Sequence, residues 1–254
     1  MSKSIFITGQ IPESGIQKLK AHGYEVDTNP HNSTLTKKEI ISFLENKPYD
    51  AVLTLLTDEI NAEVFERSPS VKLYANYATG FNNIDIEEAK KRGITVTNAP
   101  AEMASEAVAE HTIALMLALA ARIVEADEFV RQGKYTGWQA MNFVGTDILG
   151  KTLGLIGAGR IGERVAYYAK GLGMKIVYHD INRNEKLEKE LGATYQSSIE
   201  DVLKESDVIS LHVPLIDSTK HLINETRLNL MKPTAFLINT SRGPVVDEVA
   251  LEKV

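Results

Sequence analysis

One short glycine-rich segment in the second half of the chain constrains the fold more than any other feature: GAGRIG at residues 157–162. It follows an apolar, strand-like run, Thr152–Ile156, and opens a segment with helical spacing. A strand that turns through glycines into a helix is typical of a βαβ unit that binds a dinucleotide. Gly157 permits the tight turn, Gly159 lets the backbone approach a pyrophosphate, and Gly162 lets the helix pack against the strand.

An acidic residue stands where such a site needs one. The next expected strand, Lys175–His179, runs into Asp180, eighteen residues beyond Gly162. A carboxylate there accepts hydrogen bonds from the ribose hydroxyls and repels the 2′-phosphate of NADP, which favours NAD, although Arg183 could partly offset that repulsion. A glycine-rich turn followed by a strand-end Asp is the purely structural alternative. The candidate cofactor-binding residues of this segment are Gly157, Gly159, Arg160, Ile161, Gly162 and Asp180.

The rest of the chain alternates strand-like and helix-like runs. Expected strands are Ile5–Thr8, Tyr24–Asp27, Ala51–Leu56, Lys72–Ala78, Ile94–Asn98, Thr152–Ile156, Lys175–His179, Val208–Val213 and Ala235–Asn239. Expected helices are Pro12–Ala21, Thr36–Glu45, Asn61–Arg67, Ile86–Arg92 and segments that begin at Ile161, Asn184, Ile199 and Glu225. This alternation predicts an α/β protein with two doubly wound parallel-sheet domains, residues 1–99 and 100–254. Asn98-Ala99-Pro100 is the expected crossing, because proline interrupts a strand.

Between the two halves lies a long helical stretch, from about Met103 to Arg131. It is apolar almost all the way round between Ala107 and Ala121, so more than one of its faces should be buried. The pattern allows two interpretations equally: a crossover helix packed inside its own domain, or the interface of a two-fold homodimer.

Composition excludes several classes of protein. The net charge of −6 gives no electrostatic reason to bind nucleic acid, and the lack of Cys excludes thiolate catalysis and Cys-type metal sites. The longest apolar run, Thr112–Ala121, is too short to cross a bilayer, and the start MSKSIFITGQ does not read as a signal peptide. We therefore expect a cytoplasmic protein with no membrane or nucleic-acid partner.

Several further stretches carry a specific resemblance. They are ANYATGFNNIDI (Ala75–Ile86), RGITVTNAP (Arg92–Pro100), AEHTIALMLALAAR (Ala109–Arg122), LGKTLGLIGAGRIG (Leu149–Gly162), HVPL (His212–Leu215) and INTSRGPVVDE (Ile238–Glu248). Together they resemble the D-isomer-specific 2-hydroxyacid dehydrogenases, and within that family the glyoxylate and hydroxypyruvate (glycerate) reductases. The resemblance implies a flavodoxin-like substrate domain followed by a Rossmann NAD-binding domain. It also implies NAD-dependent interconversion of a small 2-keto acid and its D-2-hydroxy acid.

The resemblance also assigns residue roles. Arg242 matches the arginine that binds the substrate carboxylate and carbonyl, a task that suits a planar guanidinium fork. The backbone N–H groups of Thr79 and Gly80 match a carboxylate cradle, and Leu55 matches an apolar substrate contact. By the same resemblance, Pro214, Thr240 and Ser241 line the cofactor.

In this family a Glu and a general acid–base His follow the SRGPVVDE stretch, and the sequence ends at Val254 before them. The six histidines, His22, His31, His111, His179, His212 and His221, are not at that position. Each is interpreted as structural or solvated, and no metal site is expected. We therefore expect a C-terminally incomplete Rossmann domain that binds NAD with little turnover. The alternative function is an NAD sensor or corepressor-type relative, and the sequence leaves the choice of 2-hydroxy acid open.

Overall fold

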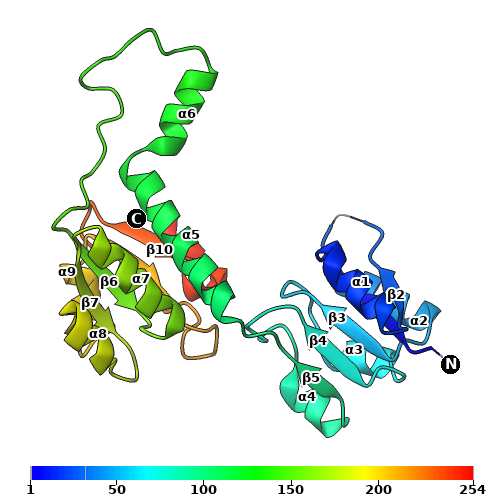
Figure 1. Cartoon of the computed structure of the whole chain (residues 1–254). Coiled ribbons are helices and arrows are strands. Elements are labelled where there is room, and N and C mark those ends of the chain that lie inside the picture. Colours follow the sequence, from blue (N-terminus) through cyan, green and yellow to red (C-terminus); the bar gives the residue numbers. More distant parts are fainter. Residues whose placement is uncertain (1, 32, 254) are drawn as a thin grey trace. The chain divides into compact units, whose positions relative to one another are not determined.

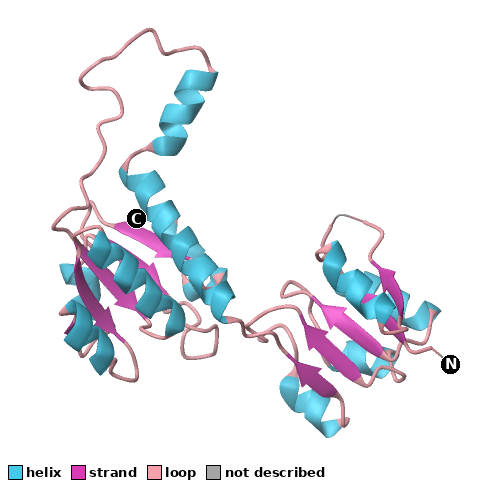
Figure 2. Ribbon diagram, in the orientation of Figure 1, coloured by secondary structure: helices cyan, strands magenta, loops and turns pink. Residues whose placement is uncertain are grey.

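The chain divides into two compact units, Met1–Ala101 and Glu102–Val254, each built around its own parallel sheet (Figures 1 and 2). The structure is a computed structural model that describes residues 2–31 and 33–253. The division falls close to the boundary expected between residues 99 and 100. Each unit is described by itself.

The N-terminal unit contains a five-stranded parallel sheet. Its strands are β1 (Ser4–Ile7), β2 (Glu25–Thr28), β3 (Ala51–Thr54), β4 (Leu73–Asn76) and β5 (Thr95–Thr97). Its helices are α1 (Glu13–Ala21), α2 (Lys37–Asn46), α3 (Ala62–Arg67) and α4 (Ile86–Lys91). The strand order β2-β1-β3-β4-β5 is the flavodoxin-like order, which places a crossover between β1 and β3. Phe6, Val52 and Tyr74, one from each of the three central strands, form the buried core with residues of α2 and α3.

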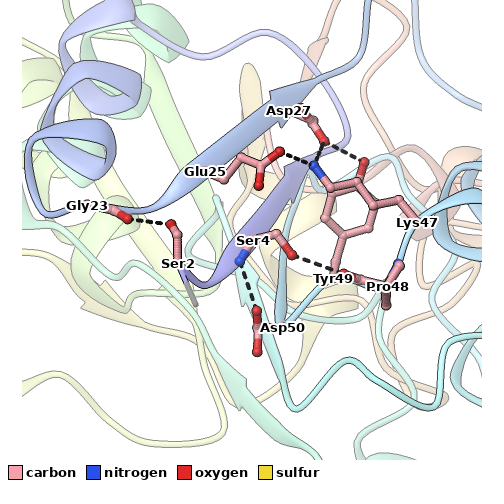
Figure 3. A network of polar contacts seen from close by, with 9 residues as sticks. All are labelled: Ser2, Ser4, Gly23, Glu25, Asp27, Lys47, Pro48, Tyr49 and Asp50. Carbon is pink, nitrogen blue, oxygen red and sulfur yellow. Dashed lines mark hydrogen bonds and ion pairs between the residues drawn. The ribbon is translucent and has the colours of Figure 1, made fainter.

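A polar network joins the edge strand β2 to the connection between α2 and β3 (Figure 3). Lys47 Nζ lies 2.5 Å from Glu25 Oε1 and 2.8 Å from Asp27 Oδ2. The buried Tyr49 donates its hydroxyl to the same Asp27 oxygen at 2.8 Å. The hydrogen bond from Lys47 lowers the pKa of Asp27, while burial raises the pKa of Tyr49 to about 12. The network therefore holds a short, half-exposed strand at the sheet edge.

The C-terminal unit contains the second five-stranded parallel sheet. Its strands are β6 (Thr152–Ile156), β7 (Lys175–His179), β8 (Thr194–Tyr195), β9 (Val208–Leu211) and β10 (Phe236–Asn239). Its later helices are α7 (Arg160–Gly171), α8 (Glu185–Leu191), α9 (Ile199–Glu205), α10 (Glu225–Leu228), the 3₁₀ turn η1 (Gly243–Val245) and α11 (Glu248–Leu251). The order β10-β9-β6-β7-β8 is the Rossmann order, with the crossover beside β6.

Apolar clusters cover both faces of this second sheet. Ile176 and Tyr178 of β7 belong to the cluster under α7, whereas Val177 between them belongs to the cluster with α9. Alternation of this kind is what a doubly wound sheet requires, because helices cover both of its faces. The predicted fold class is confirmed, and β8, a two-residue strand, is the strand that the sequence pattern did not predict.

The long helical stretch is two helices, α5 (Glu102–Ala120) and α6 (Ile123–Arg131). The expectation of one stretch to Arg131 is corrected here: Arg122 has a φ of 55°, a left-handed conformation that ends the first helix. α5 packs one face, with Ala109, Met116 and Ala120, against α7 and β10. Within the described residues α5 is the one helix long and apolar enough to cross a membrane, longer than the expected apolar run Thr112–Ala121; the core helix of a soluble protein passes the same test.

The second helix, α6, and the loop after it stand away from the sheet of their own unit (Figure 1). α6 buries none of its residues. The loop returns to the end of α5, where Thr146 N–H donates to Ala120 O at 2.8 Å. We call α6 and residues 132–146 the arm.

Candidate active site

The glycine-rich segment forms the predicted turn from β6 into α7. Gly157 has a φ of 96°, in the left-handed region that favours glycine, and a Cβ there would lie 2.5 Å from the carbonyl oxygen of His212. Its N–H donates to His179 O at 2.9 Å, so the end of β6 is tied to the end of β7. Both the backbone conformation and the neighbouring strand therefore require glycine at this position.

The next two glycines differ in what surrounds them. A Cβ on Gly162 would lie 2.2 Å from the carbonyl oxygen of Gly157, so this glycine permits the close packing of α7 on the turn. A Cβ on Gly159, by contrast, would meet no heavy atom of the described residues within 4 Å. Gly159 is also the N-cap of α7 and offers no side chain to the N–H groups of the first turn. An open cradle lined by backbone N–H groups fits a pyrophosphate.

Asp180 lies at the end of β7, beside this cradle. Its Oδ2 accepts from Ala158 N–H at 2.6 Å and its Oδ1 from Asn182 N–H at 3.0 Å. The carboxylate is thus fixed at the corner between β6 and β7, where the adenosine ribose of a dinucleotide lies in this type of fold. Of the other proposed cofactor residues, Ile161 packs partly into the core under α7, and Thr240 Oγ1 lies 2.8 Å from Thr112 Oγ1 of α5.

Arg242 follows the end of β10 in a turn held by Asn239. The Asn239 side chain accepts from the N–H and the hydroxyl of Ser241, at 3.0 and 2.7 Å, and donates to Arg242 O at 2.8 Å. The Arg242 guanidinium donates to Ser241 O at 2.7 Å, and burial lowers the pKa of Arg242 from its usual value. The backbone that carries the guanidinium is therefore fixed by one side chain.

A cavity of about 530 Å³ opens at this end of the sheet, a volume suited to a small ligand. It is lined by Leu237, Asn239, Thr240, Ser241, Arg242, Gly243, Val246, Glu248 and Leu251. Three consecutive residues that were assigned from the sequence, Thr240, Ser241 and Arg242, thus line the same cavity. Since the strands are parallel, their carboxyl ends share one edge, and the cavity lies on the same edge as the glycine turn.

In the N-terminal unit, Leu55 and Gly80 are linked by a chain of polar contacts. The buried carboxylate of Asp58 accepts from Leu55 N–H at 2.7 Å, and burial raises the pKa of Asp58. Asn83 donates to Leu55 O at 3.0 Å and exchanges a hydrogen bond with Asn76, which donates to Gly80 O at 2.8 Å. The turn with Thr79, the other candidate, is held separately by Asn98, whose amide donates to Thr79 O at 2.7 Å.

The histidines lie outside the described lining of the cavity. His212 is half-buried beside Ser210, with 2.8 Å between its Nε2 and Ser210 Oγ, and desolvation lowers its pKa to about 4. It is therefore neutral at physiological pH. His179 Nδ1 is 2.9 Å from Gln196 O, and His221 Nδ1 is 3.9 Å from Asp247 Oδ2. Among the described residues no group of His, Asp or Glu could hold a metal ion.

Sequence reasoning missed three residues of the site. Asn239 fixes the Arg242 turn, Thr112 contacts Thr240 from α5, and Glu248 lines the cavity. The quoted INTSRGP stretch contains Asn239, and an Asn two residues before a Ser is a recognisable side-chain turn signal. Thr112 and Glu248 depend on tertiary packing, so no local pattern marks them.

The description of the family whose model matches residues 113–254 is the NAD binding domain of the D-isomer-specific 2-hydroxyacid dehydrogenases. The chain belongs to this family. The dehydrogenase is 49% identical, over its whole length and 75% of the relative's, to a protein named glyoxylate reductase from Korarchaeum cryptofilum (strain OPF8).

Solved structures give the same result. The dehydrogenase matches the TT0316 protein from Thermus thermophilus with a TM-score of 0.89 and 38% identity, covering 98% of this chain and 77% of that one. It matches D-lactate dehydrogenase from Aquifex aeolicus, solved with NAD and lactic acid, with a TM-score of 0.83 and 35% identity, covering 99% and 72%. The predicted family, enzyme class and NAD cofactor are confirmed.

Proposed function

We propose that this dehydrogenase uses NADH to reduce glyoxylate, hydroxypyruvate or a similarly small 2-keto acid to the D-2-hydroxy acid. The observation that carries the proposal is the placement of Arg242, which lines the cavity on the same sheet edge as the glycine turn. The 49% identical relative named glyoxylate reductase supports a substrate of this size.

The proposed roles follow from charge. Arg242 binds the substrate carboxylate with two N–H groups and polarises the carbonyl oxygen that becomes negative. Burial lowers the pKa of Arg242, but an arginine guanidinium titrates so far above neutrality that it stays charged at neutral pH. Bound NADH supplies the hydride. In the N-terminal unit, Leu55 and the N–H groups of Thr79 and Gly80 are the proposed substrate contacts.

Two aldehydes test this assignment, because only one of them carries a carboxylate. In protein that carries the family's general acid–base His, glyoxylate should support NADH oxidation. Acetaldehyde should have a kcat/KM at least roughly a hundredfold lower, since it offers Arg242 no carboxylate. The measurement is NADH absorbance at matched concentrations. Equal rates with acetaldehyde would contradict the role of the carboxylate.

We further propose that Asp180 selects NAD over NADP. Its carboxylate is fixed at the corner of β6 and β7 and would face the 2′-phosphate as a like charge. NADH should bind at least roughly tenfold more tightly than NADPH. Asp180→Ala should reduce this ratio of affinities. Asp180→Asn is the matched control, since it removes the charge and keeps an acceptor. Calorimetry that gives equal affinities for wild-type protein would overturn the assignment.

We also propose that the arm and the exposed face of α5 form a two-fold homodimer interface. Large apolar side chains are exposed along it: Leu115, Leu119, Ile123, Val124, Val130, Tyr135, Trp138, Met141 and Val144. Trp138 is 83% exposed and Val124 71% exposed, which an isolated chain does not favour. A second copy offers the same apolar surface, so a two-fold axis covers both at once.

The double variant Val124→Glu/Trp138→Glu should convert the dimer to a monomer, because it places charge in the apolar interface. Sedimentation at micromolar concentration measures the change. Ile216→Glu is the control, since Ile216 is 55% exposed but lies outside the arm. A wild-type monomer would rule out the interface.

A further inference from the structure

Two cations follow Asp180 closely in the chain, Arg183 and Lys186. In Rossmann domains that take NADP, an arginine near this strand end binds the 2′-phosphate. The position of Arg183 alone would therefore allow NADP binding despite Asp180. What the guanidinium contacts decides whether it is available.

The Arg183 guanidinium is held by Glu188 of α8. Nε donates to Glu188 Oε1 and Nη2 to Oε2, both at 2.7 Å, so the contact is two-pronged. The guanidinium also lies over the ring of Tyr195, 5.5 Å from its centroid. A single exposed ion pair restrains a side chain weakly, but the paired hydrogen bonds and the ring contact fix one orientation.

Glu188 is itself fixed by a buried tyrosine. The hydroxyl of the fully buried Tyr178 donates to Glu188 Oε1 at 2.7 Å and accepts from Asn184 N–H at 2.8 Å. The hydrogen bond from Arg183 lowers the pKa of Glu188 to about 2, so the carboxylate is charged at physiological pH. Its side chain is 22% exposed, against 59% for Arg183, so the carboxylate is the more buried partner.

The direction of this contact follows from the strand order. Asp180 and Ala158 meet at the corner between β6 and β7, on the ribose side. Tyr195 belongs to β8, which pairs with β7 on the side opposite β6. The contact with Tyr195 therefore draws Arg183 toward the outer edge of the sheet. Lys186 is paired as well, since its Nζ lies 2.7 Å from Glu163 Oε1.

We infer that Glu188 is a specificity-determining residue, which favours NAD over NADP by holding Arg183 away from the position of the ribose 2′-phosphate. This inference rests on the proposed dinucleotide site at the glycine turn and Asp180. Glu188 acts through Arg183 and is a positioning residue with no contact to the cofactor of its own.

The test uses nucleotide fragments that differ only in the phosphate, 2′,5′-ADP and 5′-AMP, with affinities measured by calorimetry. Glu188→Gln keeps the shape of the side chain and removes the charge that holds Arg183. It should tighten 2′,5′-ADP by roughly fivefold and change 5′-AMP less than about twofold. Adding Arg183→Gln to this variant should abolish the gain. The affinity for NADPH should change in the same direction as that for 2′,5′-ADP, and the affinity for NADH should change as little as that for 5′-AMP.

Glu190→Gln is the matched control, because it removes one negative charge from the same helix and contacts Tyr167 rather than Arg183. It should leave the ratio of the two affinities unchanged. An unchanged ratio in a folded Glu188→Gln protein, or the same gain in Glu190→Gln, would overturn the inference while the dinucleotide site stands. Failure of wild-type protein to bind 5′-AMP would instead overturn the site and the inference with it.

Discussion

In protein that carries the family's general acid–base His, Arg242→Ala is expected to lower kcat/KM for glyoxylate by roughly tenfold to a hundredfold. This is a loss of about 1.5–3 kcal/mol in transition-state stabilisation. The reason is that a two-pronged, charged contact to the carboxylate is removed and no other cation lines the described cavity. The Kd of NADH should change less than about twofold, since the guanidinium addresses the substrate. Steady-state kinetics and a separate NADH titration measure the two effects.

Arg242→Lys distinguishes geometry from charge. It should recover little of the lost kcat/KM, because one ammonium group cannot reproduce the planar fork. Both variants leave in place the turn in which the Asn239 side chain donates to the carbonyl oxygen of residue 242, so the backbone should be unaltered. Wild-type kinetics in Arg242→Ala would remove this residue from the site.

The second large effect is expected at the glycine turn. Gly159→Ala should weaken NADH binding at least roughly tenfold, because the added Cβ would stand where the pyrophosphate approaches the backbone. Since that Cβ meets no described heavy atom within 4 Å in the protein alone, the fold should be unaffected. Calorimetry gives the affinity, and thermal unfolding shows whether the fold is kept.

Two further glycines on the same helix serve as comparisons. Gly162→Ala should weaken NADH binding and also lower the free energy of unfolding by about 1–3 kcal/mol, because its Cβ would lie 2.2 Å from Gly157 O. Gly171→Ala should leave NADH binding unchanged and should not lower the free energy of unfolding, since a Cβ at Gly171 meets no described heavy atom within 4 Å and lies at the far end of α7. Wild-type NADH affinity in Gly159→Ala would refute the predicted cradle.

Much of the fold could be predicted from local sequence. β6 and β7 have the predicted bounds, Thr152–Ile156 and Lys175–His179, because parallel strands with buried central residues contain apolar runs with clear ends. The glycine turn was also predictable, since the backbone conformation of Gly157 and the close packing at Gly162 each leave a mark on the sequence.

Other features arise from tertiary contacts that local patterns do not encode. No glycine or proline marks the break at Arg122, so the sequence pattern predicted one continuous helical stretch where the structure has α5 and α6. β8 has two residues, too few to show a period. The availability of Arg183 depends on Glu188 and on Tyr178 beneath it, and a sequence motif can locate the arginine without showing which group it contacts.

The central claim is that one edge of the C-terminal sheet serves both NADH and a 2-keto acid. Calorimetric titration with oxamate, an unreactive isostere of a 2-keto acid, tests this most directly, because binding needs no proton transfer. Oxamate should bind saturably to the NADH complex of the wild-type protein, and at least roughly tenfold more weakly to that of Arg242→Ala. A wild-type NADH complex that binds no oxamate would contradict the claim and favour a dinucleotide sensor.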